Sequence, residues 1–302
     1  MTAEPCAIRA DGLTKYYQSV IGVEDLSFEV RRGETYGFLG ANGAGKTTTM
    51  RLLLDLLRPD RGSAAVLGMD CHRASVQARR LIGYLPGELP IYPDLSARAY
   101  LDYLGRLEER PVPPAYLAEL LERFDVSEVD LRRPLRQQSH GMKRKIGIVQ
   151  ALMGRAPVVV LDEPTAGLDP LIVHAFHELL RDLRRRGDTT VLLSSHVLSD
   201  VESTCDRVGI IRAGRMVAIE TVGNLVRQAP RRVTIEFESP VIRDAPSLAS
   251  ATIVAQTADR WILDVRGPLG PVVAALAGLP IHDVRVDAST LEDLVVEFYR
   301  SE

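Results

Sequence analysis

The 302-residue sequence predicts an α/β protein with a mostly parallel β-sheet and helices on its faces, followed by a small α+β domain. Over residues 1–228, short apolar runs that suit buried strands alternate with helical patterns, an order typical of parallel sheets. From residue 229, alternating strands such as Val233–Glu238 and Arg260–Val265 replace that order. We therefore expect a first domain over residues 1–228, whose residues 90–155 form a mainly helical subdomain, and a second domain over residues 229–302.

The elements of the first domain begin with an alternating strand, Leu26–Val30, and an apolar strand, Thr35–Leu39. A glycine-rich loop follows, and then a Leu-rich helix over Met50–Leu57 that Pro59 and Gly62 stop. The later elements are a helical region broken by Pro111, Pro113 and Pro114, a buried strand Ala156–Leu161, a helix Leu171–Arg186, a buried strand Thr189–Ser194, and a hairpin of Val208–Ile211 and Arg215–Glu220 that turns at Ala213 and Gly214. The second domain adds a helical stretch Pro271–Leu279, a strand Val284–Val286 and an amphipathic helix Thr290–Arg300.

The composition is that of a water-soluble globular protein, with 46% hydrophobic and 25% charged residues. No apolar run approaches the roughly 20 residues of a membrane helix, and the N-terminus lacks a signal-peptide pattern. The balance of 37 basic and 40 acidic residues gives no electrostatic footprint for nucleic acid, so we expect no nucleic-acid partner. Three scattered cysteines indicate a reducing compartment, and His174 and His177, without further ligands, are expected at the surface.

The strongest motif is the glycine-rich loop, which fits G-x-x-x-x-G-K-[ST] between a predicted strand and a predicted helix, the context of a P-loop. Glycines let the backbone wrap around phosphates, and N–H groups at the helix N-terminus point at them. Lys46 would place its ammonium against the β- and γ-phosphates, and the Thr47 hydroxyl would ligate Mg²⁺. The residues expected to bind the nucleotide are Gly40, Ala41, Asn42, Gly43, Ala44, Gly45, Lys46, Thr47 and Thr48.

Two acids, Asp162 and Glu163, follow the Val-rich buried strand. The carboxyl end of such a strand faces the crevice where ligands of open α/β sheets bind. Asp162 is then placed to hold Mg²⁺, directly or through water. Glu163 would polarise the water that attacks the γ-phosphate. Together with the loop, these residues indicate a P-loop NTPase.

A third motif, Gln137–Lys145, opens a helix about two dozen residues before the two acids. It resembles the signature motif of ATP-binding cassette (ABC) ATPases, whose common form LSGGQ here reads QSHGM. Ser139 and Gly141 match, while Gln138 and His140 replace the usual Leu and first Gly. The variant HGMK resembles drug-exporter and type-2 exporter subunits. The resemblance implies a head-to-tail dimer, in which the P-loop of one subunit and the Ser139 helix end of the other bind the same ATP.

Other positions follow the same family pattern. Tyr17 matches the aromatic residue that stacks on adenine, although Tyr16 competes for this role and a plain core tyrosine is a further alternative. Ala166–Asp169 resembles the D-loop, so Asp169 would signal between the two sites. His196 matches the switch histidine that contacts the γ-phosphate.

The family pattern covers residues 8–228, with one departure. Where the family carries a glutamine that ligates Mg²⁺ and the attacking water, this sequence has Gly87. Glu88 could substitute from the next position, or water could fill the gap. Residues 229–302 are similar to the C-terminal extension of drug-resistance exporter ATPases.

The resemblance implies an ATP-binding and ATP-hydrolysing subunit of an ABC exporter, with ATP and Mg²⁺ as cofactors. ATP-dependent dimer closure would drive transport through a separate transmembrane permease, which docks around Leu85–Leu107. The subunit would then be cytoplasmic and peripheral on the inner face of the cell membrane. The alternatives are a soluble ABC ATPase that does not serve transport, a regulatory cassette with little turnover, and an importer subunit.

Overall fold

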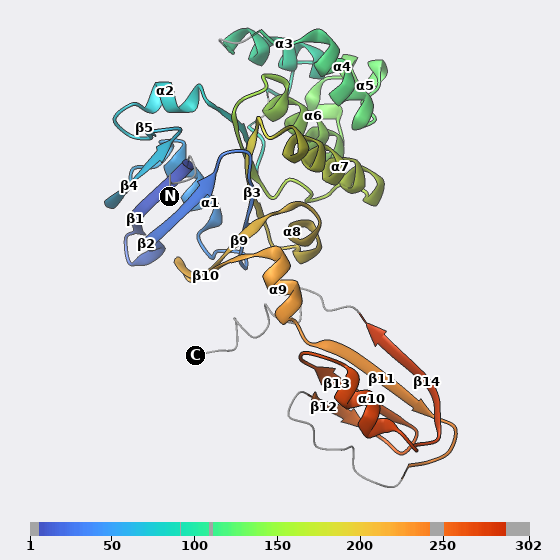
Figure 1. Cartoon of the computed structure of the whole chain (residues 1–302). Coiled ribbons are helices and arrows are strands. Elements are labelled where there is room, and N and C mark those ends of the chain that lie inside the picture. The colour runs from blue at the N-terminus through green and yellow to red at the C-terminus, as the bar shows by residue number, and fades with distance from the viewer. Residues whose placement is uncertain (1–5, 91, 109–110, 242–250, 288–302) are drawn as a thin grey trace. The chain divides into compact units, whose positions relative to one another are not determined.

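The chain has two compact units. The computed structural model describes residues 6–90, 92–108, 111–241 and 251–287 (Figure 1). Its units are Met1–Glu220 and Thr221–Glu302. Helix α9 (Val222–Gln228) begins the second unit, so the boundary expected after residue 228 falls at the end of this helix.

A six-stranded sheet forms the centre of the first unit, in the order β10-β9-β3-β8-β7-β6. Its strands are β3 (Thr35–Leu39), β6 (Ile82–Leu85), β7 (Val158–Asp162), β8 (Thr190–Ser195), β9 (Arg207–Arg212) and β10 (Arg215–Thr221). From β9 to β6 each pairing is parallel, which confirms the predicted class of sheet. Ala213 and Gly214 join β9 to β10 with φ of 48° and 80°, the left-handed values of a two-residue hairpin turn. The carboxyl ends of β3, β7 and β8 consequently lie at one edge.

A second sheet, of antiparallel strands, has the order β2-β1-β4-β5. It consists of β1 (Cys6–Tyr17), β2 (Val20–Arg31), β4 (Arg61–Val66) and β5 (Met69–Asp70). The sequence predicts only Leu26–Val30, within β2. Four register shifts interrupt the pairing of β1 with β2, and each shift breaks the two-residue alternation on which the prediction of a strand depends.

Helix α1 (Lys46–Leu53) packs in the core between strands of the two sheets, and a short helix, α2 (Ser75–Arg79), follows β5. Met50 and Leu53 of α1 belong to the same buried cluster as Phe28 and Phe38. The helix begins four residues before the predicted start and ends at Leu53 rather than Leu57. Lys46 therefore lies in its first turn, directly after the loop.

Among the described residues of the region predicted as helical there are four helices and a short 3₁₀ turn (Figure 1). They are α3 (Ala97–Leu107), α4 (Pro114–Arg123), α5 (Glu128–Arg132), the 3₁₀ turn Leu135–Gln137, and α6 (His140–Met153). Pro114 occupies the first position of α4, where a missing N–H costs nothing. After β7 and β8 come α7 (Pro170–Arg186) and α8 (Leu198–Thr204). In the part of the chain that the structure describes, every helix is too short or too polar to cross a membrane.

The second unit contains an antiparallel sheet in the order β12-β13-β11-β14. Its elements are β11 (Arg231–Phe237), β12 (Ala251–Gln256), β13 (Arg260–Val265), α10 (Gly270–Leu276) and β14 (Ile281–Asp287). Trp261 is fully buried and packs edge-on against Phe237. The prediction missed β12, and the predicted helix Thr290–Arg300 lies outside the described residues.

Candidate functional site

The glycine-rich loop runs from the end of β3 to the start of α1. Gly45 has φ 112°, and a Cβ at this position would lie 2.6 Å from the carbonyl oxygen of Gly22, so glycine is required there. Lys46 is buried, and its Nζ donates to the carbonyl oxygens of Gly40 at 2.6 Å and Ala41 at 3.3 Å. The ammonium is thus held over its own loop.

Asp162 lies at the end of β7 and is 1% exposed. Thr47 Oγ1 donates to its Oδ2 at 2.8 Å, and Ser194 Oγ donates to its Oδ1 at 2.6 Å. Both carboxylate oxygens are therefore fixed in direction. Ser194 lies beside Asp162 because β7 and β8 pair in parallel with these two residues opposite each other.

Glu163 adopts the left-handed conformation, with φ 52°. Such backbone strain in a non-glycine residue is concentrated at functional sites. The Glu163 N–H donates to Ser194 Oγ at 3.0 Å, so one hydroxyl holds both acids. His196 Nδ1 lies 2.6 Å from Glu163 Oε2. Glu163 Oε1 lies 3.1 Å from Lys46 Nζ but outside hydrogen-bond geometry, and within the described chain this buried oxygen accepts no hydrogen bond.

A cavity of about 270 Å³ opens over the loop. It is lined by Tyr17, Val20, Ile21, Gly22, the residues from Ala41 to Thr48, and Glu163. Tyr17 is half-exposed at this cavity, with its hydroxyl 3.4 Å from Thr48 Oγ1. Tyr16 instead donates its hydroxyl to Glu24 at 2.8 Å. The structure thus places Tyr17, and not Tyr16, beside the loop.

Ser139, Gly141 and Asp169 do not line this cavity. Ser139 caps the N-terminus of α6, where its Oγ accepts from the Met142 N–H at 3.1 Å. Asp169 caps α7 by accepting from the Ile172 N–H at 3.1 Å. A Cβ on Gly141 would lie 3.1 Å from the Gly167 carbonyl oxygen, so the start of α6 packs closely against the Ala166–Asp169 loop. Ser139 and Asp169 are both exposed.

Gly87 lies against the Asp162 carboxylate. A Cβ at position 87 would be 3.1 Å from Asp162 Oδ2. Glu88 lines a different pocket, so its side chain does not join the residues around the loop.

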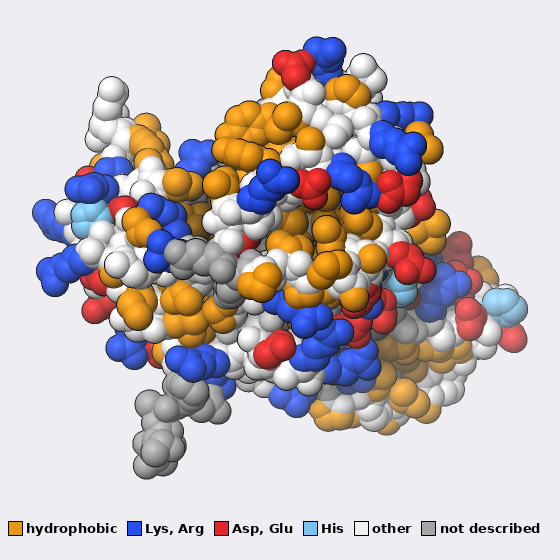
Figure 2. Space-filling view, turned by 90° about the horizontal axis from the view of Figure 1, so that it is seen from above, with side chains coloured by type: hydrophobic (Ala, Val, Ile, Leu, Met, Phe, Trp, Pro, Cys, Tyr) orange, Lys and Arg blue, Asp and Glu red, His pale blue; other side chains and the backbone are white. Residues whose placement is uncertain are grey.

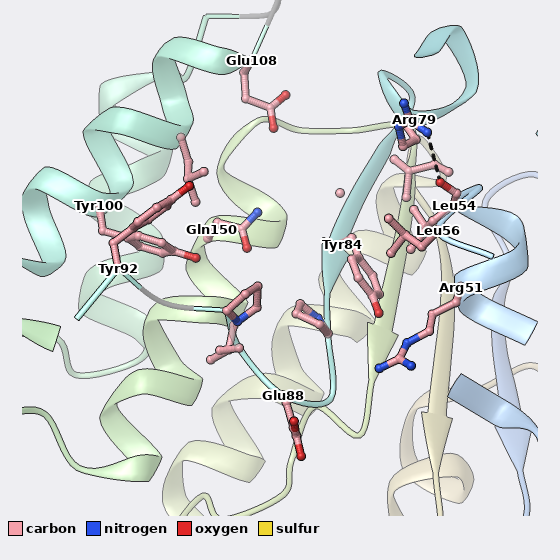
Figure 3. A pocket seen from close by; sticks show the side chains of 16 residues that line it. Arg51, Leu54, Leu56, Arg79, Tyr84, Glu88, Tyr92, Tyr100, Glu108 and Gln150 are labelled. Carbon is pink, nitrogen blue, oxygen red and sulfur yellow. Dashed lines mark hydrogen bonds between the residues drawn. The ribbon is translucent and has the colours of Figure 1, made fainter. Parts of the chain in front are cut away.

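This second pocket has a volume of about 830 Å³ and lies between the α1–β6 side of the sheet and helices α3 and α6 (Figure 3). Tyr92 and Tyr100 form one wall, and Arg51, Leu54 and Tyr84 form the opposite one. Burial and the nearby Asp162 charge raise the pKa of Tyr84 to about 12. The phenol is therefore neutral at physiological pH.

A buried polar cluster next to the site escaped the sequence analysis. Asp200 of α8 accepts from Thr165 Oγ1 at 2.5 Å, and His177 Nε2 lies 3.0 Å from its Oδ1. His177 is only 8% exposed, so the expectation of a surface residue is wrong for it, while His174 is exposed. The cluster connects the helix that follows His196 to the segment that leads to Asp169.

Comparison with known proteins identifies the family of the chain. Residues 23–166 match the family described as ABC transporter. The chain is 36% identical over 299 residues to the daunorubicin resistance ATP-binding protein DrrA3 of Streptomyces coeruleorubidus, covering 95% of this chain and 94% of that protein. It is 34% identical over 287 residues to the Nod factor export ATP-binding protein I of Burkholderia orbicola, covering 93% and 92%.

Solved structures show the same fold. An ATP-binding subunit of an ABC transporter superposes with a TM-score of 0.67 at 31% identity, covering 74% of this chain and 92% of that one. A dimeric ATP-binding cassette bound to ADP and Pi gives a TM-score of 0.65 at 19% identity over 71% and 98% of the two chains, a likeness of fold alone. With motif, fold and relatives in agreement, the chain belongs to the ABC transporter family of ATP-binding proteins.

Proposed function

We propose that this chain is the ATP-binding and ATP-hydrolysing subunit of an ABC exporter that works through a separate transmembrane permease. The observation that carries the proposal is the convergence of Lys46, Asp162, Glu163 and His196 at one edge of the parallel sheet. The relatives named for drug resistance and for Nod factor export support the direction of transport.

ATP binds with its phosphates in the glycine-rich loop. The residues Gly40, Ala41, Asn42, Gly43, Ala44, Gly45, Lys46, Thr47 and Thr48 supply this cradle. The Lys46 ammonium then gives up its hydrogen bonds to the two loop carbonyl oxygens and donates to β- and γ-phosphate oxygens instead. Hydrogen bonds to these charged oxygens are stronger than those to neutral carbonyl groups. Tyr17, half-exposed at the cavity, is placed to stack on the adenine.

Mg²⁺ fits the oxygen atoms at the end of β7. The Thr47 hydroxyl and the Asp162 carboxylate lie 2.8 Å apart, and both are hard oxygen ligands of the kind that Mg²⁺ selects. Within the described ranges no group of three His, Cys, Asp or Glu side chains is arranged for a metal, so phosphate oxygens and water would complete the coordination. Bound Mg²⁺ would neutralise phosphate charge, and Ser194, which donates to Oδ1, would keep the Asp162 carboxylate in a fixed direction as a ligand.

Glu163 acts as the general base for the attacking water. Its Oε1 accepts no hydrogen bond in the described chain, so this oxygen is available to accept one from the attacking water once Lys46 turns to the phosphates. His196, on the other carboxylate oxygen, holds the side chain and contacts the γ-phosphate. Both carboxylate oxygens of Glu163 thus have a role at the γ-phosphate.

Two copies of the chain bind ATP jointly. Ser139 and the free N–H groups behind it form an exposed helix N-terminus, which is suited to an anion and does not line the chain's own loop cavity. In a head-to-tail dimer this end meets the γ-phosphate held by the partner subunit, and Asp169 lies at the same interface. Binding closes the dimer and hydrolysis reopens it.

The 830 Å³ pocket receives a segment of the permease, which anchors the subunit at the inner face of the membrane. Seen from above, hydrophobic side chains gather on one face of the molecule, with Lys, Arg, Asp and Glu side chains among them (Figure 2). Tyr92 and Tyr103 are 51% and 44% exposed and stack edge-on, which offers an apolar wall to a partner helix.

Docking is tested with Tyr92→Asp. The negative charge at the pocket wall is expected to abolish co-purification with a polytopic membrane protein from detergent extracts, because the apolar contact would have to bury a carboxylate. Basal ATPase activity should persist. Val129→Asp, an exposed apolar residue of α5 outside the pocket, is the matched control and should retain the partner. If the native chain purifies without any membrane protein and transports nothing in vesicles, the exporter assignment fails in favour of a soluble ABC ATPase.

Gly87 is tested with Gly87→Ala. The added methyl would lie 3.1 Å from Asp162 Oδ2, so the carboxylate must shift. We expect the Mg²⁺ concentration for half-maximal ATPase activity to rise by about tenfold, the usual effect of disturbing a ligand's orientation. Gly223→Ala, whose added Cβ meets nothing within 4 Å, should leave the Mg²⁺ profile unchanged. A Gly87→Ala enzyme with the wild-type profile would mean that the space at position 87 does not control the orientation of Asp162.

A further inference from the structure

Arg144 of α6 lies beneath the site with 2% exposure. All its hydrogen bonds in the described chain go to backbone carbonyl oxygens of two loops. They are Pro86 at 2.8 Å and Gly87 at 3.0 Å from Nη1, Pro164 at 3.3 Å from Nε, and Asp162 and Glu163 from Nη2. One side chain therefore joins the loop after β6 to the loop after β7.

A buried guanidinium is costly to desolvate, and its donors must all be satisfied. Burial lowers the pKa of Arg144, while the charges of Asp162 and Glu163 oppose that shift. Only the planar fork of arginine reaches several carbonyl groups in fixed directions, because a lysine ammonium carries its three donors on one atom. The guanidinium is therefore suited to fixing the two loops relative to each other.

The backbone of Glu163 is held on both sides. Its N–H donates to Ser194 Oγ at 3.0 Å, and its carbonyl oxygen accepts from Arg144. These two contacts stabilise the left-handed φ of 52°, which sets the direction of the carboxylate. Arg144 also holds Gly87, which has no side chain to connect its own loop to the site.

We propose that Arg144 is a positioning residue that fixes Glu163 for hydrolysis and ties the Gly87 loop to it. This inference rests on the proposed role of Glu163. The loop continues through Glu88, Leu89 and Pro90, which line the docking pocket.

The first test compares Arg144→Lys and Arg144→Gln with Lys145→Gln. Lys145 is the next residue of α6 and also buried, but its Nζ lies 4.0 Å from Asp125, in another segment. We expect kcat for ATP to fall on the order of 10²-fold in Arg144→Gln, as small misplacements of a reacting group do, with KM for ATP nearly unchanged. Arg144→Lys should recover part of kcat, and Lys145→Gln should match the wild type.

The second test is amide hydrogen exchange of the same folded, full-length variants. Loss of the guanidinium should raise exchange at residues 87–89 and 163–168 and leave the β-sheet unchanged. Unchanged kcat and exchange in Arg144→Gln, or a fall in kcat that only follows the folded fraction, would overturn the proposal. The exchange result does not depend on turnover. If the wild-type chain fails to hydrolyse ATP, the proposed function fails, while the exchange still decides whether Arg144 holds the two loops.

Discussion

Glu163→Gln is expected to slow ATP hydrolysis by about 10²–10⁴-fold, the usual contribution of a positioned general base. The amide keeps the shape of the side chain but cannot accept the proton of the attacking water. The backbone contacts are untouched by this change, because the residue 163 N–H still donates to Ser194 Oγ and its carbonyl oxygen still accepts from Arg144, so the loop should stay in place. Single-turnover hydrolysis of bound ATP measures the chemical step directly.

ATP affinity is measured as the control, to show that the loss of hydrolysis in this variant is not a loss of binding. Glu163→Gln should bind ATP at least as tightly as the wild type, because it removes a negative charge 3.1 Å from Lys46. Lys46→Ala should lose binding, since it removes the cation that faces the phosphates. If Glu163→Gln hydrolyses ATP as fast as the wild type in single turnover, Glu163 is not the base. A wild-type chain that binds ATP without turnover would instead favour the regulatory cassette.

Ser139→Asp is expected to abolish ATP-driven dimerisation in a Glu163→Gln background. The new carboxylate would face the triphosphate of the partner subunit. Two like charges about 4 Å apart repel by about 4 kcal/mol at an effective dielectric of 20, which corresponds to a roughly 10³-fold weaker dimer. Light scattering with Mg²⁺ and ATP distinguishes monomer from dimer.

The matched control is Ser139→Asn. Asn and Asp cap helices about as well as Ser, so both variants should preserve the start of α6, where Ser139 accepts from Met142. Asn has nearly the size of Asp without its charge, and the Asn variant should still dimerise with ATP. Equal dimerisation of the two variants would mean that Ser139 does not face a phosphate.

The sequence was sufficient to predict the loop and the two acids, because each motif is local and each lies at a strand end that its apolar pattern reveals. Lys46 and Asp162 are 116 residues apart, yet the parallel order of β3, β8 and β7 brings their strand ends together. The family resemblance added Ser139 and His196, whose residue types alone carry little information.

Ser194 and Arg144 could not be predicted in the same way. Ser194 reaches both acids because the β7–β8 register places it opposite Asp162. Register is a property of the paired strands, so neither strand's sequence alone reveals it. Arg144 resembles any basic residue of a helix, and only the fold shows that its guanidinium is buried among carbonyl groups. His177 was misjudged for the same reason, since its partner Asp200 lies on another helix.

A single Ser194 hydroxyl donates to Asp162 and accepts from the Glu163 N–H. We therefore expect few single substitutions to be tolerated at positions 162, 163 and 194. A substitution at Ser194 disturbs Asp162 and the Glu163 backbone at once. Replacements at these three positions should therefore be epistatic: a substitution that is tolerated with one pair of neighbours would abolish ATP hydrolysis with another. Lineages that alter this trio are expected to have done so through coordinated exchanges.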